Sequence, residues 1–101
     1  MTDITPQMLH RVAQDALGIK EAYMANKHVW IPGGPEFDPR ADAGQDRLLE
    51  NWLLDNGYWI GITGDGFTLS DGNQVVFEME APRNEFRVLA VNAVLEADDA
   101  G

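Results

Sequence analysis

Apolar residues recur at helical spacing near the start of the chain. Six of them fall on one helical face: Met8, Leu9, Val12, Ala13, Ala16 and Leu17. Thr5 suits the N-cap and Pro6 the first helical position, where a missing N–H costs nothing. Gly18 suits the left-handed residue beyond the last turn. The pattern predicts an amphipathic helix over residues 6–17.

The next stretch, residues 19–41, shows no sustained period and contains Pro32, Gly33, Gly34, Pro35 and Pro39. These residues interrupt both helices and central strands, so we expect a long loop. Its several aromatic and aliphatic side chains indicate that the loop packs on the body of the protein. It either covers the core or carries a function, since ordered loops of this length are often functional.

Helical spacing returns after residue 41. Asp42 and Gln45 stand at capping-box positions, and Gly57 provides a terminator. The apolar arc of this second helix consists of Leu48, Leu49, Trp52 and Leu53.

From Tyr58 the apolar period changes from helical to alternating. Segments 58–63, 67–70 and 75–80 have the composition of strands. They are separated by the turn sequences Gly64-Asp65-Gly66 and Asp71-Gly72-Asn73. Two tight turns predict a three-stranded antiparallel meander.

The last predicted helix runs from about Asn84 to about Ala97 and is apolar on two sides. One arc contains Phe86, Ala90, Ala93, Val94 and Ala97, and the other contains Val88, Val91 and Leu95. A helix of this kind is buried on more than one side. The second arc is covered either by the first helix or by a partner chain.

These elements predict an α+β fold in a single domain over residues 1–101, with its core in residues 42–97. We expect a three-stranded antiparallel meander with helices packed as an α/β/α layered sandwich, in the order α, long loop, α, β, β, β, α. The residues expected to be mostly buried are Leu49, Trp52, Leu53, Ile60, Ile62, Val75, Phe77, Phe86, Leu89 and Ala93.

Residues 37–97 also carry a pattern of motifs. A Phe-Asp-Pro opening is followed by a helix, the run Asn56-Gly57-Tyr58-Trp59-Ile60, a short hairpin, Glu80-Ala81-Pro82 and an alanine-rich last helix. This order resembles the phage ABA-sandwich domain, a small domain of bacteriophage and prophage proteins. The resemblance implies a phage origin and an α/β/α layered fold, and it implies no reaction.

The chain has 17 acidic and 7 basic residues, for a formal net charge of -10. Such a surface repels phosphate, so we expect basic protein partners and no direct binding of nucleic acid. The chain has no cysteine and only two histidines, so we expect no disulfide, no metal site and no cofactor. Catalytic motifs are also missing from the sequence, and we therefore expect no enzymatic activity.

The first residues lack a basic segment followed by an apolar one, and no stretch is apolar over the roughly 18 to 20 residues that span a bilayer. We therefore expect a soluble protein with no membrane association, located in the cytoplasm of the host cell.

Acidic residues are concentrated around the start of the second helix. The predicted partner-binding patch consists of Glu36, Asp38, Asp42, Asp46 and Glu50. The alternative is that these carboxylates serve the helix N-terminus, the pairing of Arg47 with Glu50, and solubility.

Two classes of function follow. The first is a small acidic phage accessory protein that binds and inhibits or modulates a host protein, such as a nucleic-acid-handling or defence factor with a basic surface. The second is a structural or assembly module that binds another phage protein through apolar helix faces. A homodimer formed through Val88, Val91 and Leu95 is a further expectation, unless the first helix covers this arc.

Overall fold

The computed structural model describes residues 4–100. Its helices are α1 (Pro6–Arg11), continued by the π-helical segment η1 (Val12–Ala16), α2 (Ala43–Asp55), and α3 (Phe86–Ala100), which follows the 3-10 segment η2 (Arg83–Glu85). A two-stranded hairpin contains β1 (Tyr23–Ala25) and β2 (His28–Trp30). A three-stranded sheet contains β3 (Trp59–Ile62), β4 (Gly66–Ser70) and β5 (Val75–Glu80) in that order. The predicted α+β class and antiparallel meander are confirmed.

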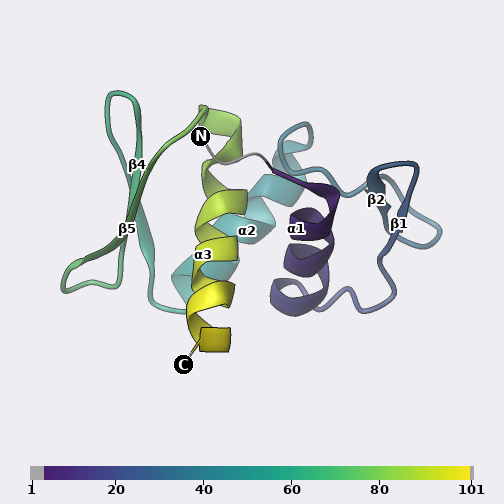
Figure 1. Cartoon of the computed structure of the whole chain (residues 1–101), viewed down its shortest axis with the longest axis horizontal. Coiled ribbons are helices and arrows are strands. Elements are labelled where there is room, and N and C mark those ends of the chain that lie inside the picture. The colour runs from purple at the N-terminus through teal and green to yellow at the C-terminus, as the bar shows by residue number, and fades with distance from the viewer. Residues whose placement is uncertain (1–3, 101) are drawn as a thin grey trace.

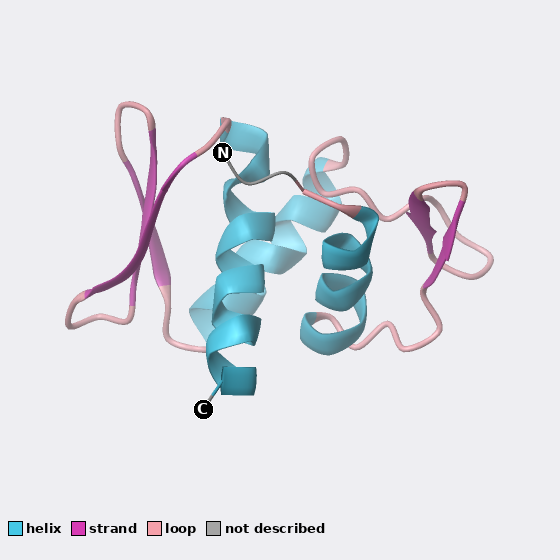
Figure 2. Ribbon diagram, in the orientation of Figure 1, coloured by secondary structure: helices cyan, strands magenta, loops and turns pink. Residues whose placement is uncertain are grey.

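The elements are stacked in layers along the molecule. Figure 1 shows the three-stranded sheet at one end, α2 and α3 beside it, α1 next to α3, and the β1–β2 hairpin at the far end. The described helices all lie on the same side of the three-stranded sheet, as Figure 2 also shows. The layers are therefore ordered sheet, helix, helix, hairpin, and none of the described helices covers the outer face of the sheet.

The first helix begins and ends as its sequence predicts. The backbone N–H of Met8 donates to Oγ1 of the N-cap Thr5 over 3.2 Å. Beyond Arg11 the helix widens into one π-helical segment, in which the N–H of Leu17 donates to the carbonyl oxygen of Val12. Gly18 then adopts a left-handed conformation with φ of 71°.

Residues 19–41 contain a hairpin that the sequence pattern did not predict. β1 and β2 pair antiparallel around Asn26 and Lys27, whose φ angles are 54° and 67°. Two left-handed residues in succession are typical of a two-residue type I′ turn. The expectation of an irregular loop was wrong here because strands of three residues are too short to show a period. The expected packing is confirmed, since Val29 and Phe37 are fully buried.

The start of α2 is fixed by Asp42 and Gln45. Asp42 caps the helix, and its Oδ1 accepts from the backbone N–H of Gln45 over 3.1 Å. The Gln45 side chain does not return to the cap. It is buried, and it accepts from the N–H of Asp38 over 2.7 Å and donates to the carbonyl oxygen of Glu36 over 2.9 Å. Gln45 thereby holds the preceding loop against α2.

The register of the sheet separates two faces. Ile62 and Met79 pair with Phe67, and Ile60 and Phe77 pair with Leu69, so these six side chains share the face toward the helices. Phe67 and Leu69 on the central strand are fully covered. Figure 1 shows α3 beside the sheet. The two outer strands are more exposed than β4.

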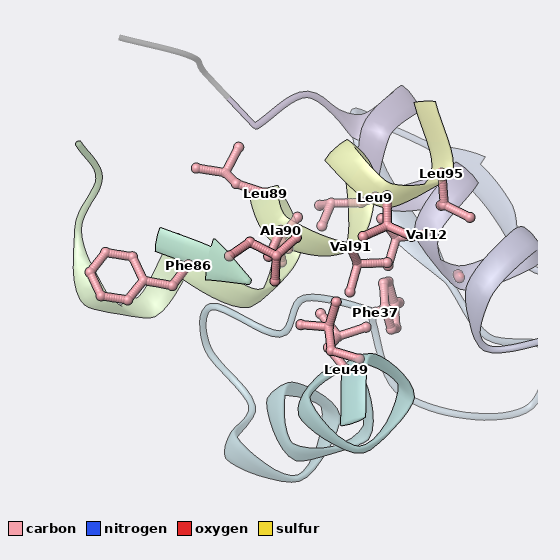
Figure 3. Close-up of a cluster of buried hydrophobic side chains, with 14 of the residues drawn as sticks. Leu9, Val12, Phe37, Leu49, Phe86, Leu89, Ala90, Val91 and Leu95 are labelled. Atoms are coloured by element: carbon pink, nitrogen blue, oxygen red, sulfur yellow. The ribbon is translucent and has the colours of Figure 1, made fainter. Parts of the chain in front are cut away.

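One hydrophobic core runs from α1 to the sheet. Figure 3 shows Val12, Phe37 and Leu49 gathered around Val91 of α3. The second arc of α3, Val88, Val91 and Leu95, is buried within the single chain. The self-association predicted through this arc loses its basis, because α1, η1 and α2 already cover the arc.

The expected core is confirmed in its centre and wrong at its margin. Leu49, Leu53, Phe86 and Leu89 are buried, and Trp52, Ile60, Phe77 and Ala93 are partly buried. Ile62 and Val75 are each 54% exposed. Ile62 lies on an outer strand, at the margin of the face toward the helices. Val75 pairs with Ser70 beyond the register shift, so it lies on the other face of the sheet, which no described helix covers.

Candidate protein-binding site

The residues of the predicted acidic patch each have a partner within the chain. Asp42 caps α2, as described above. Glu36 Oε2 lies 2.6 Å from Nδ1 of His28, and Asp38 Oδ1 lies 2.8 Å from Nε of Arg40. The N-terminal part of the patch is therefore a set of local contacts rather than one continuous surface of free carboxylates.

Asp46 and Glu50 share one cation from a distant helix. Arg87 of α3 places Nη1 3.1 Å from Asp46 Oδ2 and Nη2 3.4 Å from Glu50 Oε2. Burial raises the pKa of Asp46 and the charge of Glu50 raises it further, while the charge of Arg87 and its hydrogen bond act in the opposite direction. Two carboxylates on one guanidinium leave a local negative excess.

A groove lies directly beside this ion pair, between the second half of α2 and the outer strand β3. It has a volume of about 130 Å³. Its walls are formed by Glu50, Leu53, Leu54, Tyr58, Trp59, Ile60, Ile62 and Arg87. Leu54 is 46% exposed, and Trp59 and Ile62 are each 54% exposed. Two of these apolar side chains, Leu54 and Ile62, thus stand open to solvent at one groove, which is typical of an interaction surface. The Trp59 side chain alternates with Ile60, so it points to the opposite face of the sheet, where its ring lies near Gly72.

The strand that forms one wall of the groove also has an open backbone edge. The N–H of Thr63 donates to the carbonyl oxygen of Gly66 over 2.9 Å at the β3–β4 turn. Because bonded pairs alternate in an antiparallel ladder, Gly61 bonds to β4, whereas Ile60 and Ile62 point their backbone groups away from it. Within residues 4–100, no strand lies on that side of β3.

The sequence around the groove has a charge bias that the predicted acidic patch does not include. Residues 48–82 contain no lysine, arginine or histidine. Their acidic residues are Glu50, Asp55, Asp65, Asp71, Glu78 and Glu80. Asp65, Glu78 and Glu80 line a second hollow at the end of the sheet where β3 turns into β4. The sequence signal for this surface is the absence of lysine, arginine and histidine over residues 48–82. Clusters of acidic residues do not reveal it, because the six carboxylates are spread along the whole stretch.

The described residues show no group of three or more histidine, cysteine, aspartate or glutamate side chains placed to hold a metal ion. Among the same residues, no helix is long and apolar enough to cross a membrane. The arrangement consists of an apolar groove, an open strand edge and surrounding carboxylates, which is the chemistry of a surface that binds another chain.

Comparisons of this chain with protein families, with curated proteins and with solved structures found no match. The resemblance of residues 37–97 to the phage ABA-sandwich domain therefore remains a prediction from the sequence.

Proposed function

We propose that this protein binds a basic partner protein and modulates it, and that binding is centred on the groove between α2 and β3. The observation that carries the proposal is the position of Leu54 and Ile62 at the groove. These half-exposed side chains lie within residues 48–82, which carry six carboxylates and no cation.

The two parts of this surface have different roles in binding. Apolar and aromatic side chains at the centre of an interface supply most of the contact energy. Surrounding charges accelerate association with a partner of opposite charge and disfavour partners of like charge. The net charge of -10 extends this selection to the whole molecule.

The proposal moves the binding centre relative to the sequence prediction. Of the predicted acidic patch, Glu50 lines the groove. Asp42 caps α2, and Asp46 joins α2 to α3 through Arg87. Glu50 shares Arg87 with Asp46, but its side chain is 49% exposed, against 22% for Asp46. We therefore assign the steering charge to Glu50 and to the carboxylates of the sheet, rather than to the N-terminal end of α2.

The resemblance to the phage ABA-sandwich domain extends the proposal to its biological setting. On that resemblance, the partner is a host protein met in the host cytoplasm, and occupation of its basic surface inhibits or modulates it. The alternative of an assembly module bound through apolar helix faces is less well supported, because the α3 arc that suggested it is buried within the chain.

Site-specific photo-crosslinking tests the proposal, with a matched pair of positions on α2. Leu54 lines the groove, whereas Leu48 is similarly exposed, at 50%, and does not line it. A photo-reactive residue at position 54 should capture a basic protein in cells that produce this chain, and the same residue at position 48 should not. Equal capture at both positions, or capture of an acidic protein at position 54, would contradict the proposal.

A further inference from the structure

We infer that the segment of the partner that occupies the groove is an extended chain that adds to the open edge of β3 as a fourth strand. Its apolar side chains face α2, and lysine or arginine residues alternate with them. This inference rests on the proposed function and specifies how the basic partner is held.

The backbone of β3 offers the hydrogen bonds that such a strand requires. The N–H and C=O groups of Ile60 and Ile62 point away from β4, by the alternation that the Thr63–Gly66 bond establishes. Two residues that each present a donor and an acceptor on one side form the template for β-strand addition.

The other outer strand is protected in ways that β3 is not. β5 carries Glu78 and Glu80, and its pairing with β4 contains a register shift at Leu69 and Ser70. Charges and bulges on outer strands are devices that prevent edge pairing. Residues 58–63 contain neither a charged residue nor a proline.

Side-chain chemistry then selects the sequence of the added strand. On the side toward the helices, its residues meet Leu53, Leu54 and Ile62, so apolar side chains fit there. Residues of the opposite phase face solvent on the outer side of the sheet, where the formal net charge of -10 of the molecule favours cationic side chains. A second copy of this chain is a poorer occupant, because it brings a formal charge of -10 against another of -10.

The experiment uses short acetylated peptides in which valine alternates with lysine, and matched peptides in which glutamate replaces lysine. Binding to the full chain is followed by backbone amide hydrogen exchange and amide proton shifts. At about ten times Kd, exchange of the Ile60 and Ile62 amides should slow about tenfold. The Gly61 amide, which already bonds to β4, should change little.

Two controls separate strand addition from other modes of binding. N-methylation of the peptide at the residues that face β3 should abolish binding, and N-methylation at the intervening residues should not. Leu54→Ser should weaken binding of the lysine peptide by about tenfold or more, whereas Leu48→Ser should leave it unchanged.

The outcomes distinguish this inference from the function on which it rests. Stronger binding of the lysine peptide without protection of Ile60 and Ile62 would overturn strand addition and leave the basic-partner function standing. Equal protection by both peptides would support strand addition and overturn the preference for a basic partner. If the Ile60 and Ile62 amides become protected without peptide as the protein concentration rises, β3 pairs with a second copy of this chain, and the inferred partner strand is overturned. Absence of binding by any peptide at about 1 mM would also overturn the inference.

Discussion

Arg87 of α3 and Asp46 of α2 join two helices across 41 positions of the sequence, with Nη1 3.1 Å from Oδ2. The same guanidinium reaches Glu50 on the next turn of α2. Asp46 Oδ1 and Arg87 Nε are buried and have no hydrogen-bond partner among residues 4–100. This ion pair borders the proposed binding groove, so its integrity affects both the stability of the fold and the shape of the site.

Replacement of Arg87 by leucine should therefore destabilise the protein. The change leaves two neighbouring carboxylates without their cation, and we expect a loss of about 1–3 kcal/mol in the free energy of unfolding. Urea denaturation measures this loss. Arg47→Leu is the matched control, because Arg47 is an exposed arginine of α2, and its effect should stay within about 0.5 kcal/mol.

The raised pKa of Asp46 predicts how Asp46→Asn depends on pH. Burial is the main cause of the shift, so the folded state binds a proton at Asp46 more tightly than the unfolded state does. At pH values above the pKa of Asp46 in the folded state, its ionised carboxylate therefore lowers the free energy of unfolding. This loss of stability disappears as the pH falls below the pKa of Asp46 in the unfolded state, about 3.8. The stability of Asp46→Asn relative to the natural protein should accordingly be higher at pH 7 than at pH 3, and the opposite trend would show that pairing with Arg87 outweighs burial.

Gln45→Ala should release the loop that precedes α2. The substitution removes an acceptor for the N–H of Asp38 and a donor for the carbonyl oxygen of Glu36, so we expect a cost of about 1–3 kcal/mol. Faster hydrogen exchange at the Asp38 amide would locate the effect. Gln7→Ala, at an exposed position of α1, should change neither measurement.

Gly66→Ala should be among the most damaging single substitutions in the sheet. A Cβ at this position would collide with the carbonyl oxygen of Met79 and lie 2.7 Å from the Cα of Glu80. Because both obstacles are backbone atoms of β5, the sheet must shift, at a cost of about 3 kcal/mol or more. Gly64→Ala provides the control, since no atom lies within 4 Å of its added Cβ. Similar midpoints in thermal unfolding for the two variants would refute this account.

Val91→Glu should unfold the protein rather than dissociate a dimer. Val91 is fully buried among residues of the same chain, so the substitution places an unpaired carboxylate in the core. We expect a loss of most of the stability of a domain of this size, detected by circular dichroism. Val76→Glu adds the same charge at a half-exposed position and should leave the secondary structure intact.

Features that depend on neighbours along the chain were predictable without the structure. The Thr5 cap, the Asp42 cap and the left-handed Gly57 each involve residues within a few positions of one another. The three-stranded meander followed from two turns between alternating segments. Local backbone preferences and short hydrogen bonds govern all of these, and a single sequence displays them.

Features that depend on which faces meet were decided by tertiary packing. The arc of Val88, Val91 and Leu95 has the same pattern whether a partner or another helix covers it, and only the folded chain shows that α1, η1 and α2 do so. The β1–β2 hairpin was missed because its strands are too short to carry a period. The groove at Leu54 and Ile62 exists because α2 and the outer strand β3 do not close on each other. Exposure of an apolar residue is set by contacts with residues distant in the sequence, and hydrophobic spacing along the chain does not encode where those contacts end.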